Sequence, residues 1–338
     1  MFNKLSSIVH GNKKIYYYER MMRHRNDIDF VNRVIDINRD ERSIRLLHVV
    51  NSDTVLYYIE VNQYGMGMGA FLRWAIHGLW EADKYNWIPV IKFSGVYDEK
   101  KVINGTTNMF EYYYKQPGKY DISSLKNETC FLFDEGTLKR HANCYGMSKD
   151  LLVGYDINDK YIVDMGRLAA KYLHLNDSTQ KYICDSINSI IDQNDKVIGV
   201  HIRGTDYKLK WKNHPKMISP KQYYDYIDTL INNGYNKIFL ATDDEEYVEL
   251  FMQKYARNIV LYGDVNRGRD KVNVAMAENR RANNNYLNGL EVIRDIYTLA
   301  ACDALVSGLS QVSVASRIIN QAIGKEYSEC IIINNGVN

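Results

Sequence analysis

The stretch of this sequence best suited to chemistry is Val197 to Tyr207, VIGVHIRGTDY. Its first part, Val197 to Ile202, is a mostly apolar run, which is typical of a central parallel strand covered on both faces. Arg203 and Asp206 follow directly, and open α/β sheets bind ligands outside the carboxyl ends of their strands. Arg203 is a permanent cation that can clamp phosphate oxygens with two hydrogen bonds. The stretch therefore predicts a turn that faces a bound anion.

Polar residues also end the next two strong strands in this half of the chain. Carboxylates at a strand end suit ribose hydroxyls or the N–H donors of a base. Free N–H groups at the start of a helix suit phosphate. Because parallel strands end at one edge of a sheet, these groups predict a nucleotide site. The residues concerned are Asp243, Asp244, Ser310 and Gln311, with Val312 as a further binding candidate at the start of the helix.

Two more candidates come from a strand and a helix beside these turns. His201 lies within the first strand, where a histidine is either a satisfied core residue or a ligand-binding group. Asp295 lies on a helix with apolar residues on two sides. A largely buried carboxylate there needs a partner, which is Arg294, Arg317 or a ligand.

Each polar group also has a purely structural interpretation. The two aspartates at 243 and 244 could cap the following helix, and Ser310 could cap its own. Arg203 and Asp206 could form an internal ion pair. The convergence of these groups on one sheet edge favours the functional interpretation over any single structural one.

The elements that must position these groups alternate between strands and helices. The pattern predicts an α/β fold whose C-terminal domain, residues 177–338, is a doubly wound parallel sheet, preceded by an α/β domain over residues 1–176. Strands are expected at 197–202, 237–241, 258–261, 304–306 and 330–333, and helices at 220–233, 245–255, 286–302 and 311–323. Two further helices are expected between 162 and 191, the second capped by Ser178. The polar loop 263–285 is either mobile or a lid.

The N-terminal half contains a strand at 54–61, a glycine-rich turn with Gly65 and Gly67, a helix at 70–85 and a strand at 88–93. The turn lacks the third glycine spacing of a dinucleotide fingerprint, and no acidic residue ends the second strand. We therefore expect a tight turn whose backbone approaches a ligand or the other domain. Residues 109–116 are expected to be helical.

Composition excludes several classes. Lys and Arg number 43 against 41 Asp and Glu, a net charge of +2, which gives no argument for nucleic acid. Five cysteines without metal-ligand spacing favour neither zinc nor disulfides, and they suit the cytoplasm. No apolar run is long enough for a membrane span.

The basic group Arg20, Arg23, His24 and Arg25 is either a solvated helix face or a peripheral contact with anionic lipid. The Asp27 to Asp29 DxD triplet follows no strand, so chance explains it better than a metal site.

Three motifs in order resemble those of the GDP-fucose-dependent fucosyltransferases, and most closely the α1,6-fucosyltransferases, which include the enzyme of N-glycan cores and the rhizobial chito-oligosaccharide enzyme. They are VIGVHIRGTDY at 197–207, IFLATDDEEY at 238–247 and GLEVIRDIYTLAACDALVSGLSQVSVASRIINQ at 289–321. The resemblance implies a GT-B-like architecture of two Rossmann-type domains, with GDP-fucose bound by the C-terminal one. It also implies inverting transfer without a metal ion or other cofactor.

The resemblance also assigns roles. Arg203 resembles the arginine that neutralises the β-phosphate of GDP, and His201 and Asp295 resemble residues near guanine and ribose. Asp206 matches the acidic residue that closes the first motif, and we take it as the candidate base. The remaining matches are the Asp243-Asp244 pair and the Ser310-Gln311 element beside the diphosphate.

The chain departs from the family pattern in its first motif. Gly204 stands where the family has a second arginine, and Tyr207 where it has a lysine. Lys208 could restore one lost charge. Residues 208–220 contain no Asp or Glu, although the family's proposed general base lies in this region.

The expected function is transfer of fucose from GDP-fucose to a hydroxyl of a surface glycan or glycan precursor. The expected partners are a nucleotide sugar and a carbohydrate acceptor. Two alternatives stay open: the same fold acting on another nucleotide sugar, and a non-catalytic module that binds nucleotide or glycan.

Overall fold

The computed structural model describes residues 18, 21–27, 31, 44–50, 54–148, 150, 154–155, 157–210, 212–269 and 281–338, and of Asp206 it describes the main chain alone. The expectations for Arg20, for Asp29 of the DxD triplet and for residues 270–280 of the proposed lid lie outside these ranges. In the part of the chain that is described, no helix is both long and apolar enough to cross a membrane.

Contacts group the chain into two compact units. One comprises Met1–Val61, Trp74–Phe93 and Gln116–Val153, and the other Asn62–Arg73, Ser94–Lys115 and Gly154–Asn338. This grouping does not show which pieces fold alone, so the domain boundary between residues 176 and 177 stays a prediction.

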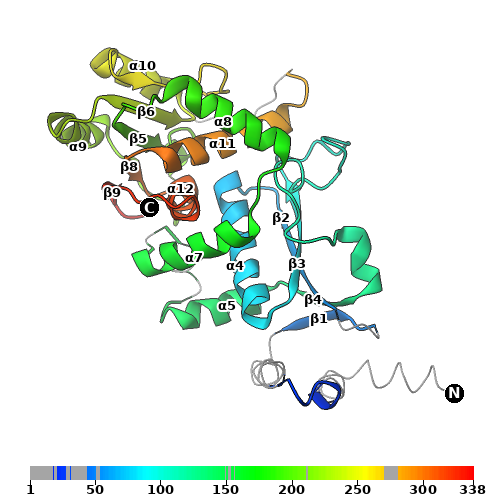
Figure 1. Ribbon diagram of the computed structural model, residues 1–338. Helices are drawn as coiled ribbons and strands as arrows, with labels where there is room; N and C mark the ends of the chain where they lie inside the picture. The colour runs from blue at the N-terminus through cyan, green and yellow to red at the C-terminus, as the bar shows by residue number, and fades with distance from the viewer. Residues whose placement is uncertain are drawn as a thin grey trace. The chain divides into compact units, whose positions relative to one another are not determined.

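The N-terminal half builds a four-stranded sheet in the order β1-β4-β2-β3 (Figure 1). β4 runs parallel to β2 and antiparallel to β1. The strand, helix and strand predicted here are present. The helix, α4, begins two residues earlier than expected, at Met68. The elements are β1 (Arg45–His48), β2 (Val55–Gln63), α4 (Met68–Tyr85), β3 (Ile88–Gly95), η1 (Ile122–Asn127), β4 (Thr129–Leu132) and α5 (Glu135–Cys144).

The helix expected at 109–116 is wrong, because residues 109–113 form turns and Tyr114 forms an isolated bridge. The Asn108 side chain accepts a hydrogen bond from the Phe110 N–H at 3.2 Å, and Tyr114 pairs with Leu175 in an isolated antiparallel bridge. Tyr113 stacks on Tyr286, with ring centroids 5.4 Å apart. Tertiary packing of tyrosines therefore overrides the local helical pattern.

The C-terminal half builds the predicted parallel sheet, with five strands in the order β7-β6-β5-β8-β9. Every neighbouring pair in it is parallel. The strands are β5 (Val197–Ile202), β6 (Lys237–Thr242), β7 (Ile259–Val260), β8 (Ala304–Gly308) and β9 (Glu329–Ile333). The order places β5 at the centre, as its continuous burial requires.

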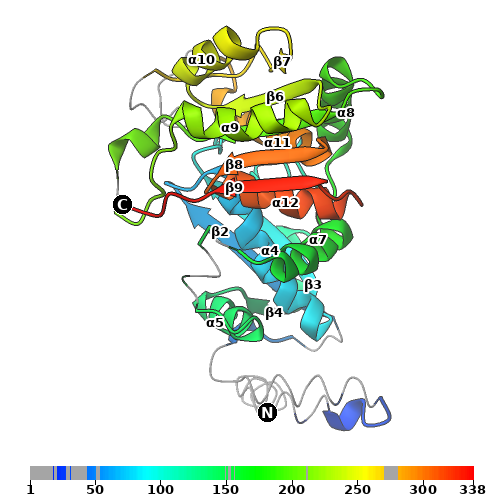
Figure 2. The same cartoon turned by 90° about the vertical axis from the view of Figure 1, so that its left-hand side faces the viewer.

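Helices cover both faces of this sheet (Figure 2). Alternate residues of a strand point to opposite faces. Ile198 and Val200 of β5 pack in the core that contains residues of α9 and α10, whereas Val197 belongs to a second core with Leu299 of α11. The helices are α7 (Asp159–Tyr172), α8 (Asp177–Ile190), α9 (Pro220–Asn232), α10 (Glu245–Tyr255), α11 (Asn284–Ala301) and α12 (Gln311–Ala322).

The cap predicted for the second helix between 162 and 191 is wrong by two positions. Asn176, and not Ser178, is the N-cap of α8, and its side chain accepts from the Thr179 N–H at 2.9 Å. Asparagine is as good a cap as serine, so composition alone does not choose between neighbouring candidates.

Candidate active site

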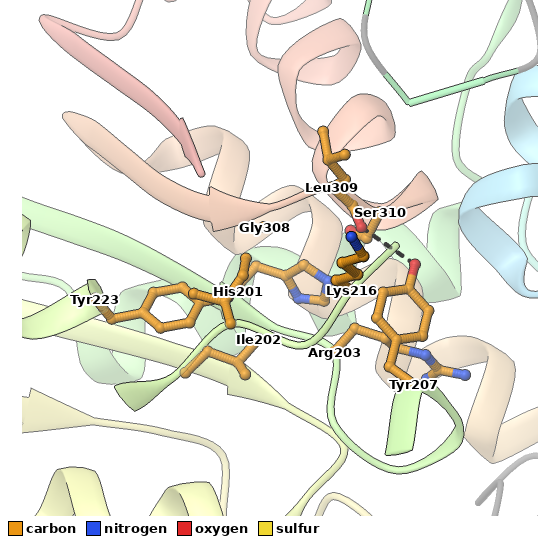
Figure 3. Close-up of a pocket in the computed structure, with 10 residues that line it drawn as sticks. His201, Ile202, Arg203, Tyr207, Lys216, Tyr223, Gly308, Leu309 and Ser310 are labelled. Atoms are coloured by element: carbon orange, nitrogen blue, oxygen red, sulfur yellow. Dashed lines mark hydrogen bonds between the residues drawn. The ribbon is translucent and has the colours of Figure 1, made fainter. Parts of the chain in front are cut away.

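A small hollow opens where β5 and β8 end (Figure 3). Its volume is about 270 Å³, counted out to its open mouth. It is lined by the end of β5, by the turns that follow β5 and β8, and by residues before and within α9. The polar and aromatic side chains are His201, Arg203, Tyr207, Lys216, Tyr223 and Ser310. Three of these residues, His201, Arg203 and Ser310, were predicted from the sequence.

His201 is buried in this wall, with 6% of its surface exposed. Neither ring nitrogen has a hydrogen-bond partner among the described residues. The Ala241 carbonyl is near enough to favour the protonated ring slightly, but it is outside hydrogen-bond geometry. Burial lowers the pKa of His201 to about 4, so the ring is neutral near pH 7. No described residue therefore satisfies this core histidine, and a bound water or a ligand in the hollow would supply its partner.

Arg203 reaches the hollow while it holds a carboxylate of the next strand. Its guanidinium is paired with Asp243, which also accepts from the Gly204 N–H at 2.9 Å and the Thr205 hydroxyl at 2.8 Å. Burial acts to raise the pKa of Asp243, but Arg203 and the two hydrogen bonds outweigh it and hold the pKa below its usual range. The ends of β5 and β6 are thus locked together. The Asp206 side chain, the other proposed partner of Arg203, lies outside what is described.

Asp244 serves the structure and not the hollow. It caps α10 by accepting a hydrogen bond from the Glu246 N–H at 3.0 Å, so the capping interpretation of Asp244 is confirmed. Its carboxylate also contacts the Lys208 ammonium at 2.6 Å. The same carboxylate fills the space in which a side chain at Gly204 would begin. Lys208 is further paired with Glu246 at 3.1 Å, so its charge is directed to these two carboxylates.

The turn between β8 and α12 presents a helix N-terminus to the hollow. Ser310 caps α12 by accepting from the Ser313 N–H at 3.0 Å, so the capping alternative is confirmed. The Tyr207 hydroxyl donates to the Leu309 carbonyl at 3.1 Å and ties this turn to the one after β5. The residue that departs from the family's lysine thus has a structural role.

The glycine-rich turn approaches the same helix start. A Cβ added to Gly69 would lie 2.7 Å from the Gln311 carbonyl and 2.8 Å from the Val312 nitrogen. Arg73 of α4 donates to the Gln311 side chain at 3.0 Å. The close backbone approach expected of this turn is therefore present, although it occurs at Gly69. Gly65 and Gly67 are exposed in the turn itself and do not line the hollow.

Asp295 lies on α11 and does not line the hollow. Arg294 and Arg317, its proposed internal partners, are paired with Asp264 and Asp159 instead. Burial, opposed by the charges of Arg294 and Arg267, raises the pKa of Asp295 to about 7. No hydrogen bond or ion pair to its carboxylate occurs among the described residues. Because Asp295 is only partly buried, either water or a ligand can supply its partner, so its role in binding stays a prediction.

Within the described ranges, no group of three or more His, Cys, Asp or Glu side chains is arranged to hold a metal ion.

Comparison with known families decides between the possible nucleotide-binding folds. The family model for alpha-(1,6)-fucosyltransferase N- and catalytic domains matches residues 159–329, just over half of the chain. The chain belongs to the α-(1,6)-fucosyltransferase family. It is therefore a glycosyltransferase, and the hollow lies within the matched region.

Solved fucosyltransferases resemble this chain in structure, and one of them shares its fold. NodZ α-1,6-fucosyltransferase, in crystals soaked with GDP-fucose, superposes with a TM-score of 0.51 at 14% identity, over 80% of this chain and 93% of that one. NodZ from Bradyrhizobium gives 0.49 at 12% identity, over 79% and 92%. FUT1 of Arabidopsis thaliana, in complex with GDP, gives 0.46 at 9%, over 96% and 79%. The match to NodZ soaked with GDP-fucose shows a GT-B-like α/β fold for this chain. A search of curated proteins finds no match.

Sequence reasoning about this fucosyltransferase missed several residues at the site. Lys216 and Tyr223 line the hollow from a loop and a helix that carry no recognisable motif. Arg73 reaches Gln311 from α4. Gly69 could have been found, because it is the last glycine of the GxGxG run.

Proposed function

We propose that this chain transfers fucose from GDP-fucose to a hydroxyl of a surface glycan or glycan precursor, with inversion at the anomeric carbon and without a metal ion. One observation carries the proposal. A buried histidine without a partner, an arginine and a helix N-terminus surround one hollow in the region that matches the fucosyltransferase family. This is the set of groups that a nucleoside diphosphate requires.

In this proposal the diphosphate lies between Arg203 and the start of α12. The acceptor oxygen attacks the anomeric carbon of fucose, the bond from that carbon to the β-phosphate oxygen breaks, and GDP leaves with the electron pair. Arg203 and the N–H groups of the helix stabilise the charge that grows on the phosphate. Preorganised groups of this kind contribute roughly 3–4 kcal/mol each to transition-state stabilisation.

The guanosine part is assigned to His201 and Asp295. Each is a polar side chain that finds no hydrogen-bond partner among the described residues. A neutral imidazole and a carboxylate with a raised pKa can both exchange hydrogen bonds with the edge of a purine. The proton of the acceptor hydroxyl passes to a carboxylate. Asp206 remains our candidate from the sequence, since none of the described side chains that line the hollow is acidic.

Another nucleotide sugar is the second candidate donor. Gly204 has no room for a side chain, and Lys208 is paired with Asp244 and Glu246. Neither position therefore restores the positive charge that the family pattern has beside Arg203. We keep a cytoplasmic location in the proposal, because all five cysteines are free thiols. Contact of the basic N-terminal segment with anionic lipid stays a prediction.

The test is GDP release from GDP-fucose in the presence of a panel of glycan acceptors and EDTA. Wild-type protein is expected to release GDP with an acceptor, and Arg203→Ala to do so at least about a hundredfold more slowly. GDP-mannose and UDP-sugars serve as donor controls. Release that needs added metal, a faster reaction with another donor, or normal turnover by Arg203→Ala would each contradict the corresponding part of the proposal.

A further inference from the structure

Among the described side chains that line the hollow, two are basic, Arg203 and Lys216, and none is acidic. Arg203 is already paired with Asp243, so the pair contributes little net charge to the site. A nucleoside diphosphate carries more than one negative charge. Arg203 alone therefore leaves part of that charge without a counter-ion.

Neither Lys208 nor the position of Gly204 supplies the missing positive charge. The Lys208 ammonium contacts Asp244 at 2.6 Å and Glu246 at 3.1 Å. At Gly204 the Asp244 carboxylate occupies the space of any side chain. Lys216, by contrast, has no hydrogen bond or ion pair from its ammonium to any described residue. In Figure 3 its side chain extends over the hollow toward the turn that carries Ser310.

The backbone around Lys216 is held on both sides. The Lys216 N–H donates to the Gly336 carbonyl at 2.9 Å, and Pro215 forms an antiparallel bridge with Val337. The next contact along the chain fixes Ile218, whose carbonyl accepts from the Tyr247 hydroxyl at 2.8 Å. These contacts hold the main chain of Lys216 beside the hollow, although its side chain is exposed.

We infer that Lys216 is a substrate-binding residue that supplies the second positive charge for the diphosphate of the donor. The inference rests on the proposed function, because it needs a nucleoside diphosphate in this hollow. It also goes beyond it, since Lys216 belongs to none of the three sequence motifs. Lys216 would contact the phosphates from the side opposite the β5 turn, and would have no role in holding the nucleoside.

The experiment compares binding of GDP, GMP and guanosine by calorimetry at low salt, for wild type, Lys216→Ala, Lys216→Arg and Lys212→Ala. Lys212 is the matched control, because it is an exposed lysine of the same loop that does not line the hollow. Loss of one charged contact is expected to weaken GDP binding by Lys216→Ala about tenfold or more. Guanosine binding should be unchanged, and Lys216→Arg should recover most of the loss.

The outcomes separate the two proposals. If wild type does not bind GDP, the proposed function fails. If wild type binds GDP and Lys216→Ala binds it equally well, the function stands and the role of Lys216 is wrong. An equal loss for Lys212→Ala would show general attraction by the loop, and an equal loss for guanosine would show a folding defect. Either result would overturn the inference.

Discussion

Burial shifts the pKa values of two ionisable side chains, His201 in the hollow and Asp295 on α11, and in each the shift favours the neutral form. The pKa of His201 is lowered to about 4 and that of Asp295 is raised to about 7. In both, desolvation disfavours the charged form, because neither side chain has a counter-ion in direct contact. Polar groups left unpaired in this way cost folding free energy, and a ligand that pairs with them recovers it.

The raised pKa of Asp295 predicts a pH dependence of stability. The folded protein binds this proton up to about pH 7, whereas an unfolded Asp releases it near pH 4. Between these values the folded state holds more protons, so the free energy of unfolding falls as the pH rises from about 4 to about 7, and is level above that.

Urea unfolding of wild type and Asp295→Asn across this range measures the effect. The difference between the two proteins should change in favour of Asp295→Asn as the pH rises. A constant difference would show that Asp295 titrates with its ordinary pKa.

At the scale of elements, the start of α12 is fixed by its contact with the start of α4. A side chain at Gly69 would press on the main chain of Gln311 and Val312 at 2.7 and 2.8 Å. Gly69→Ala is therefore expected to lower the free energy of unfolding by about 1–3 kcal/mol through overpacking. Alanine is otherwise the better helix residue by up to about 1 kcal/mol, so propensity alone predicts the opposite sign.

Gly65 provides the matched control, because no atom lies within 4 Å of a Cβ built there. Gly65→Ala should change the free energy of unfolding by less than about 0.5 kcal/mol. Denaturant curves of the two variants decide the point. Equal free energies of unfolding for both variants would mean that the main chain at the start of α12 shifts to accept the added methyl group without loss of stability.

Elements with strong local signals were predictable from the sequence. The bounds of β5 and α10 agree with the prediction, since turn residues flank β5 in the sequence and Asp244 caps the start of α10. The turns at 109–113 were not predictable, because the tyrosine contact that holds them involves Tyr286, far away in sequence. The same applies to Lys216, whose place at the site depends on hydrogen bonds to residues near 336.

At the scale of the whole molecule, binding of the correct nucleotide should stabilise the fold. A ligand at a hundred times its dissociation constant adds about 2.7 kcal/mol to the free energy of unfolding. GDP is expected to raise the melting temperature more than UDP at the same concentration, because His201 and Asp295 are assigned to the guanosine. Equal shifts in a thermal melt would contradict the guanine assignment.

The order of strands and helices in the C-terminal half, and its family, could be predicted from three motifs. The motifs also located the strand ends that form the hollow. They could not show that Asp243 and Asp244 form ion pairs with Arg203 and Lys208, since a carboxylate after a strand suits either an internal cation or a ligand. That distinction depends on which cations the folded chain brings to them.

The Gly204 N–H donates to Asp243 at 2.9 Å although it lies in a turn. Such an amide should exchange slowly with deuterated solvent, unlike its neighbours in the loop that follows. Because Asp243 also holds Arg203, a molecule that draws the guanidinium away would loosen this acceptor. The rate at which this single amide takes up deuterium would then report occupancy of the hollow, without a label and before any turnover is measured.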